Sequence, residues 1–284
     1  MNASSSAPST QRMVRGFAAV MVAAAVLCAA VLLLVSGTRP QPGDSPTRET
    51  RATEEPTEPP VIIPENPYGP EDFAYEGGYM TCLAGSARLG VDVSAHQGEI
   101  DWEQVREAGV EFAIIRIGYR GYTSGGLYED EYARANLEGA REAGLEVGAY
   151  FYSQALNPEE AREEAQFCLE ILDGFELDFP MVYDWEYVSS EARTADMDRD
   201  TLMECIRGFC GEVELAGYRP MVYFNPTMAQ SLLELEELLE YPWWLAMYSD
   251  EMSYPYQVEM WQYTATGSVP GISGDTDLNL WLGA

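Results

Sequence analysis

The sequence predicts an α/β barrel of eight strands and five helices, preceded by an apolar N-terminal segment and a Pro-rich linker. Two observations after Arg88 predict the barrel. Short apolar runs rich in β-branched and aromatic residues recur eight times, and longer amphipathic stretches fill the first five intervals between them. The intervals between the last three strands are too short for a comfortable helical crossover. The final third of the barrel should therefore depart from a regular eightfold β/α repeat and use hairpin-like connections.

Local signals place each element of the barrel. The strands are expected at residues 89–93, 112–119, 147–153, 180–186, 219–225, 243–248, 259–264 and 277–281. The helices are expected at residues 102–108, 130–143, 158–172, 199–215 and 227–240. Asp101 is a suitable N-cap for the first helix, and Asn157 followed by Pro158 marks the start of the third.

Residues 17–35 form an uncharged apolar run of 19 residues. As a helix, this run is long enough to cross a bilayer core of about 30 Å. Arg12 and Arg15 precede it and acidic residues follow at a distance, so the positive-inside rule places residues 1–16 in the cytoplasm. We expect a signal anchor at residues 17–36 of a single-pass cell-membrane protein whose C-terminal domain is extracellular. A signal peptide cleaved near Gly37, which would give a secreted protein, is the main alternative, and a buried core helix is a further one.

Residues 37–78 are rich in Pro, Glu and Thr, and nine of the 17 prolines lie between residues 38 and 70. Proline lacks a backbone N–H and favours extended conformations. We therefore expect a semi-rigid linker at residues 37–78 that holds a barrel domain, residues 79–284, away from the membrane.

Charge excludes one class of partner. The 16 basic residues, all Arg, face 47 acidic residues, which gives a net charge of −31. Such a chain repels the phosphates of nucleic acids, so no nucleic-acid partner is expected.

Four acidic residues stand out near the carboxyl ends of predicted strands, where barrel active sites are built. Asp92 ends the first strand, Asp184 and Glu186 end the fourth in MVYDWEY, and Asp277 lies in the final GDTDLNLW. Because side chains alternate along a strand, Asp184 and Glu186 should point to one side and Trp185 to the other. Crowding raises the pKa of at least one carboxyl of such a pair, and paired carboxyls are the usual apparatus of glycoside hydrolysis.

Aromatic residues at strand ends are candidate contacts for sugar rings, although about half of them must face the helices instead. Expected substrate contacts are Tyr152, Tyr223, Trp261 and Gln262. His96, the only histidine, is expected at the surface or in a hydrogen bond rather than in catalysis.

The motifs GVDVSAHQGEIDW, AIIRIGYR, VGAYFYSQA, MVYDWE, YRPMVYFN, WWLAMY, WQYT and GISGDTDLNLW occur in the order and spacing of glycoside hydrolase family 25. The chain resembles these Chalaropsis-type lysozymes, or muramidases, over residues 89–282. The sequence departs from many relatives in its third-strand motif, where YFYS stands in place of a motif with His.

The resemblance implies a modified, TIM-like (β/α)5β3 barrel that hydrolyses the β-1,4 bond between N-acetylmuramic acid and N-acetylglucosamine in peptidoglycan. It implies that Asp92, Asp184, Glu186 and Asp277 are catalytic, with Glu186 as the general acid and Asp184 orienting the substrate's N-acetyl group as nucleophile. Direct attack on the sugar by a carboxylate of the protein is the alternative mechanism. A barrel that binds cell-wall glycan without cleaving it, and a hydrolase of another extracellular glycan, are the alternative functions.

No cofactor and no metal ion are expected, although four converging carboxylates could hold Mg²⁺ or Ca²⁺. The expected partners are peptidoglycan strands and, through the N-terminal helix, the membrane, and the protein is expected to be monomeric. Disulfides between Cys168 and Cys205 and between Cys82 and Cys210 are one alternative for the cysteines, and free buried thiols are the other.

Overall fold

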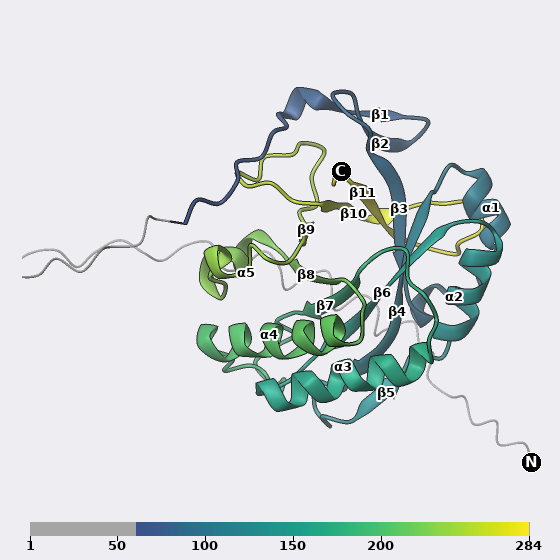
Figure 1. The fold of residues 1–284 in the computed structure, drawn as a ribbon. Helices are drawn as coiled ribbons and strands as arrows, with labels where there is room; N and C mark the ends of the chain where they lie inside the picture. The colour runs from purple at the N-terminus through teal and green to yellow at the C-terminus, as the bar shows by residue number, and fades with distance from the viewer. Residues whose placement is uncertain (1–60, 284) are drawn as a thin grey trace, which may run out of the picture. The chain divides into compact units, whose positions relative to one another are not determined.

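The computed structural model describes residues 61–283, and its central feature is a closed barrel of eight strands (Figure 1). Strand β3 pairs with β4 on one side and with β11 on the other, which closes the ring. A ninth strand, β5 (Leu127–Glu129), pairs with β4 outside the ring. The barrel strands are β3 (Arg88–Val93), β4 (Phe112–Arg120), β6 (Glu146–Ser153), β7 (Met181–Trp185), β8 (Pro220–Phe224), β9 (Trp243–Ala246), β10 (Met260–Gly267) and β11 (Thr276–Trp281).

The direction of the strands confirms that the final third of the barrel is irregular. Neighbouring strands are parallel from β3 round to β10, and β11 is antiparallel to both β10 and β3. The expected hairpin-like connection is present between β10 and β11. It was wrong for β9 and β10, which are parallel and are joined by residues 247–259 without a helix.

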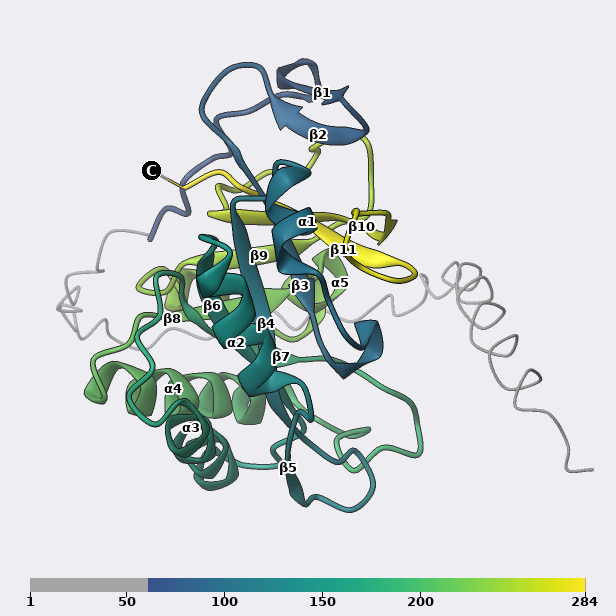
Figure 2. The same cartoon turned by 90° about the vertical axis from the view of Figure 1, so that its right-hand side faces the viewer.

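Five helices cover the outside of the barrel (Figure 2). They are α1 (Trp102–Glu107), α2 (Ala133–Glu142), α3 (Pro158–Leu172), α4 (Arg199–Leu215) and α5 (Pro226–Ser231). The predicted caps are in use, since Asp101 accepts a hydrogen bond from the Gln104 N–H and Asn157 accepts one from the Glu160 N–H.

Two helix predictions were wrong at one end. Helix α2 begins three residues later than expected, and Asp130 lies before it, where its carboxylate accepts hydrogen bonds from Arg116, from the Ala95 N–H and from the Tyr132 N–H. Helix α5 ends at Ser231 rather than near residue 240, because the chain leaves the helical path at Leu232, where φ is −127°. This departure lets Leu233, Leu235 and Leu238 all pack into the core.

A hairpin that the sequence did not predict lies N-terminal to the barrel. Strand β1 (Phe73–Glu76) pairs with β2 (Tyr79–Cys82) around Gly77 and Gly78, which both adopt positive φ. The Phe73 ring packs edge-on against Trp261 of the barrel, with ring centroids 5.1 Å apart. The folded region therefore begins before Tyr79, and residues 73–78 are not part of a linker.

Within residues 61–283, no helix is long and apolar enough to cross a membrane, and the expected anchor at residues 17–36 lies outside the described part of the chain. The four cysteines of the described region, Cys82, Cys168, Cys205 and Cys210, are buried free thiols, which is the second of the two alternatives expected from the sequence. They lie in the apolar layer that packs the helices and the β1–β2 hairpin against the outer face of the barrel.

A candidate active site at the carboxyl ends of the strands

A small pocket brings the four predicted carboxyl residues together at the carboxyl ends of the parallel strands. Its volume is ≈ 180 Å³, and we term it the carboxylate pocket. It is lined by Asp92, Arg116, Tyr150, Tyr152, Asp184, Glu186, Tyr223, Trp244, Tyr248, Gln262 and Asp277.

Strand geometry explains this convergence. Asp184 and Glu186 line the pocket, whereas Trp185 between them is buried in the layer outside the barrel, as alternation along the strand requires. On the far side of the barrel, Asp277 pairs in register with Asp92 across the antiparallel β11–β3 ladder. The reversed direction of β11 is what brings a residue from the start of that strand to the edge where the other strands end.

Asp92 is held by two amide side chains. Its Oδ2 accepts hydrogen bonds from Gln262 Nε2 at 2.7 Å and from Asn279 Nδ2 at 2.8 Å. The Gln262 Oε1 in turn accepts from the hydroxyls of Tyr223 and Tyr248, so the amide nitrogen of Gln262 must face Asp92. Burial and the neighbouring Asp277 raise the pKa of Asp92 well above its ordinary value, and the two amides partly oppose this shift.

Asp184 and Glu186 also lie in an environment that favours the protonated form of a carboxyl. Burial, followed by the charges of Glu186 and Asp92, raises the pKa of Asp184 well above its ordinary value. One Asp184 oxygen is buried without a hydrogen-bond partner among the described residues. Burial and the charge of Asp277 raise the pKa of Glu186 to about 7, and burial raises that of Asp277 to about 6. Glu186 can therefore carry a proton near neutral pH, as a general acid must.

Arg116 is the one cation in the lining of the carboxylate pocket. Its guanidinium is held by Asp130, with nitrogen–oxygen distances of 2.8 Å, and its charge lowers the pKa of Asp184 in opposition to burial. Among the described residues, no group of three or more His, Cys, Asp or Glu side chains is arranged to hold a metal ion.

The structure places three of the four expected substrate contacts in the pocket, namely Tyr152, Tyr223 and Gln262. It does not place Trp261 there. Trp261 is fully buried on the outer face of the barrel, where it packs against Phe73 and donates from Nε1 to the Met247 carbonyl. As expected, His96 is exposed and does not line the pocket.

Sequence reasoning missed five residues at the site. Arg116, Tyr150, Trp244 and Tyr248 line the pocket, and Asn279 supports Asp92 while accepting a hydrogen bond from Trp244 Nε1. Alternation could have found several of them, because Asn279 lies two residues from Asp277 and Tyr150 lies two residues from Tyr152.

Gln154 supports Glu186 from outside the pocket. This fully buried side chain donates from Nε2 to the Glu186 carbonyl oxygen at 3.1 Å and accepts from the Thr194 hydroxyl at 2.7 Å. Its own N–H donates to Glu164, which is buried between Ser153 and Arg120. Gln154 thereby connects both ends of the segment that follows β7.

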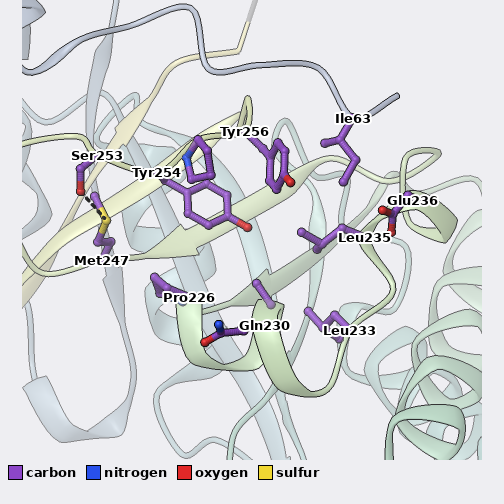
Figure 3. A pocket seen from close by; sticks show the side chains of 12 residues that line it. Ile63, Pro226, Gln230, Leu233, Leu235, Glu236, Met247, Ser253, Tyr254 and Tyr256 are labelled. Carbon is purple, nitrogen blue, oxygen red and sulfur yellow. Dashed lines mark hydrogen bonds between the residues drawn. The ribbon is translucent and has the colours of Figure 1, made fainter. Parts of the chain in front are cut away.

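A larger cavity of ≈ 570 Å³ lies beside α5 and the β9–β10 connection (Figure 3). Most of its lining is apolar or aromatic, including Leu233, Leu235 and Tyr254, and Glu236 is its one acidic residue. Paired carboxyls are absent from this lining, which therefore lacks the acid–base groups that the smaller carboxylate pocket contains.

The raised pKa of Glu186 predicts how stability depends on pH. Glu186 titrates near its ordinary value of 4.5 in the unfolded chain and at about 7 in the folded protein. Its contribution to the free energy of unfolding is therefore fully present below about pH 4.5, where the side chain is protonated, and is lost as pH rises through 7. At pH 8 we expect Glu186→Gln to be more stable than the wild type, by at most on the order of 3 kcal/mol, and at pH 4 to match it. Thermal unfolding at both pH values measures this, with the exposed Glu142→Gln as control. Equal effects of Glu186→Gln at both pH values would contradict the assignment.

Comparison with known proteins agrees with this geometry. Residues 91–272 match the model of glycosyl hydrolases family 25. The chain is 31% identical over 232 residues to the uncharacterized protein YegX of Escherichia coli K12, covering 75% of this chain and 78% of YegX. It is 29% identical over 208 residues to lysozyme M1 of Streptomyces globisporus, covering 69% of this chain and 68% of that one.

The fold is similar to that of the modular autolysin LytC of Streptococcus pneumoniae, with a TM-score of 0.63 and 28% identity. The match covers 74% of this chain and 52% of LytC, so the chain spans about half the length of that protein. LytC has also been solved in complex with a synthetic peptidoglycan ligand. The matched family model covers most of the barrel and the structure supplies the carboxylate pocket, so this chain belongs to glycosyl hydrolases family 25.

Proposed function

We propose that this protein is a peptidoglycan hydrolase of the muramidase type, which cleaves the β-1,4 bond between N-acetylmuramic acid and N-acetylglucosamine. The observation that carries the proposal is the convergence of four carboxyls in one pocket, where burial raises the pKa of Glu186 to about 7. Family membership supports a glycosidic bond as the target, and the similarity to lysozyme M1 supports peptidoglycan as the polymer.

In the proposed reaction, Glu186 donates its proton to the glycosidic oxygen as the bond to the leaving sugar breaks. Asp184 orients the substrate's N-acetyl group, whose carbonyl oxygen attacks the anomeric carbon, and stabilises the positive charge that develops on it. Asp92, held by Gln262 and Asn279, and Asp277 bind the sugar and keep the pKa of the neighbouring carboxyls high. Water then releases the product, with Glu186 acting as the base.

The test is digestion of purified peptidoglycan by the full-length chain, followed by mass analysis of the new reducing ends. We expect N-acetylmuramic acid at these ends, and at least about 100-fold slower release of such ends by the Glu186→Gln control. Reducing ends of N-acetylglucosamine would overturn the bond assignment. Retention on the wall without any new reducing ends would instead favour a non-catalytic glycan-binding barrel.

The position of Gln154 predicts a loss of rate without loss of binding. Gln154→Ala removes the donor to the Glu186 carbonyl and leaves the buried Thr194 hydroxyl unpaired. Because small displacements of a catalytic group cost rate steeply, we expect kcat to fall roughly 10- to 100-fold while KM changes little. The exposed Gln166→Ala on α3 is the matched control. Unchanged kcat, or a rise in KM alone, would contradict this role.

We also propose that the barrel is extracellular and is tethered to the cell membrane by residues 17–36. The uncharged run with Arg12 and Arg15 on its N-terminal side supports this topology. Protease added to intact, wall-stripped cells should cut near Arg48 or Arg51 and release the C-terminal part of the chain. Recovery of the protein from the medium with a new N-terminus near Gly37 would instead establish a cleaved signal peptide.

A further inference from the structure

One row of aligned residues runs from the carboxylate pocket onto the β4–β5 hairpin. In order across six neighbouring strands, the row consists of Tyr128, Tyr119, Tyr152, Asp184, Tyr223 and Trp244. Residues aligned in adjacent strands project from the same face of a sheet. The last four line the carboxylate pocket, so Tyr119 and Tyr128 continue its wall beyond the barrel.

An irregularity in β4 makes this continuation possible. The register of β4 against β6 shifts between Arg116 and Gly118. Arg116 faces the pocket, and strict alternation would put Tyr119, three residues later, on the opposite face. The shift returns Tyr119 to the pocket side, where the Arg116 guanidinium carbon lies 5.3 Å from the centre of its ring. Such bulges commonly re-aim side chains next to active sites.

The hairpin presents aromatic surface to solvent. The rings of Tyr119 and Tyr128 are stacked, with centroids 5.3 Å apart and planes inclined by 23°. Even so, Tyr128 is 44% exposed, and two further tyrosines, Tyr122 in the hairpin turn and Tyr187 directly after Glu186, are 51% and 57% exposed. Exposed apolar surface that gathers beside a site marks a binding surface.

One buried and one half-buried ion pair hold the hairpin in place. Arg120 donates to the Gly125 carbonyl at 2.8 Å and is itself anchored by buried Glu164 at 2.7 Å. From the segment after β7, the Arg193 N–H donates to the Tyr122 carbonyl at 2.8 Å, while its guanidinium pairs with Glu160. A surface that is rigid before binding loses little conformational entropy when a ligand docks.

We propose that the β4–β5 hairpin is a sugar-binding platform, on which Tyr128 stacks against a further pyranose ring of the glycan strand, away from the bond that is cleaved. Three strand spacings separate Tyr128 from Asp184, about 14 Å along the row. The platform is therefore continuous with the pocket but outside it, and it suits a polymer rather than a disaccharide. The inference rests on the proposed function, because it takes the same glycan strand as ligand.

The test compares short and long glycans in the Glu186→Gln background, where the substrate survives the measurement. The probes are a disaccharide and an octasaccharide of alternating N-acetylglucosamine and N-acetylmuramic acid, titrated by calorimetry into the full-length chain. Tyr128→Ala should weaken octasaccharide binding about 10-fold, equivalent to 1.4 kcal/mol, and leave disaccharide binding unchanged. Tyr128→Phe and Tyr128→Trp keep a ring and should retain the affinity.

The matched control is Tyr75→Ala. Tyr75 is 50% exposed on the β1–β2 hairpin, which lies at the opposite edge of the barrel from β5 (Figures 1 and 2). Unchanged octasaccharide affinity in Tyr128→Ala, or an equal loss in Tyr75→Ala, would overturn the platform. If Tyr128→Ala fails to fold, loss of octasaccharide affinity in Tyr128→Phe, which keeps the ring, would also overturn it. A different result would contradict the proposed function: wild-type protein that does not cleave peptidoglycan. That result can occur even if octasaccharide binding depends on Tyr128, so the two failures can be told apart.

Discussion

Replacing Glu186 by Gln should reduce the rate of peptidoglycan cleavage at least about 100-fold, because the variant keeps the shape of the side chain but has no proton to donate. General acid catalysis contributes on the order of 10²- to 10⁴-fold. Glu191→Gln is the matched control, since Glu191 is an exposed glutamate in the segment that follows Glu186. Initial rates of reducing-end formation measure the effect.

The dependence of this loss on pH and leaving group identifies the role. With a pKa of about 7, Glu186 is protonated and active below pH 7 and loses its proton above it, so wild-type activity should fall on the alkaline side. That alkaline limb should be absent in Glu186→Gln. An aryl glycoside whose phenol leaves without protonation should recover much of the lost rate. Equal losses on peptidoglycan and on the aryl glycoside would show that Glu186 is not the acid.

Much of the fold could be predicted because its signals are local. Helices α3 and α4 begin and end where expected, since Asn157 with Pro158 and Asp198 cap their first turns. The β1–β2 hairpin could not be predicted in the same way, because its only buried ring, Phe73, is stabilised by Trp261, which is distant in the sequence. The local propensities of residues 73–82 cannot indicate a contact with a residue so distant in the sequence.

The error at Trp261 has a simple geometric cause. Trp261 and Gln262 are neighbours on β10, and neighbours on a strand face opposite sides, so only one of them can reach the pocket. Gln262 is the one that does, through its hydrogen bond to Asp92. The alternation of side chains that correctly separated Asp184 from Trp185 also shows which of Trp261 and Gln262 faces the pocket. The same rule gives the wrong face for Tyr119, because the shift in β4 that turns this residue toward the pocket has no signature in the sequence.

Asp184→Asn should be nearly as severe as Glu186→Gln on peptidoglycan, with a loss on the order of 10²- to 10³-fold, because the amide cannot stabilise the positive charge that forms on the attacking N-acetyl group. The rates of the two variants should differ on the aryl glycoside. Asp184 assists the nucleophile rather than the leaving group, so the improved leaving group should not restore the rate of Asp184→Asn.

Stability provides an independent check on the same variant. Burial and the charges of Glu186 and Asp92 raise the pKa of Asp184, so its ionised form destabilises the fold, and Asp184→Asn should unfold at a higher temperature than the wild type at pH 8. A rate loss with raised stability cannot be attributed to misfolding. Asp196→Asn, at an exposed position in the segment after β7, should change neither quantity. A mild rate effect in Asp184→Asn would move the assisting role to Asp92 or Asp277, the other carboxyls that share the pocket.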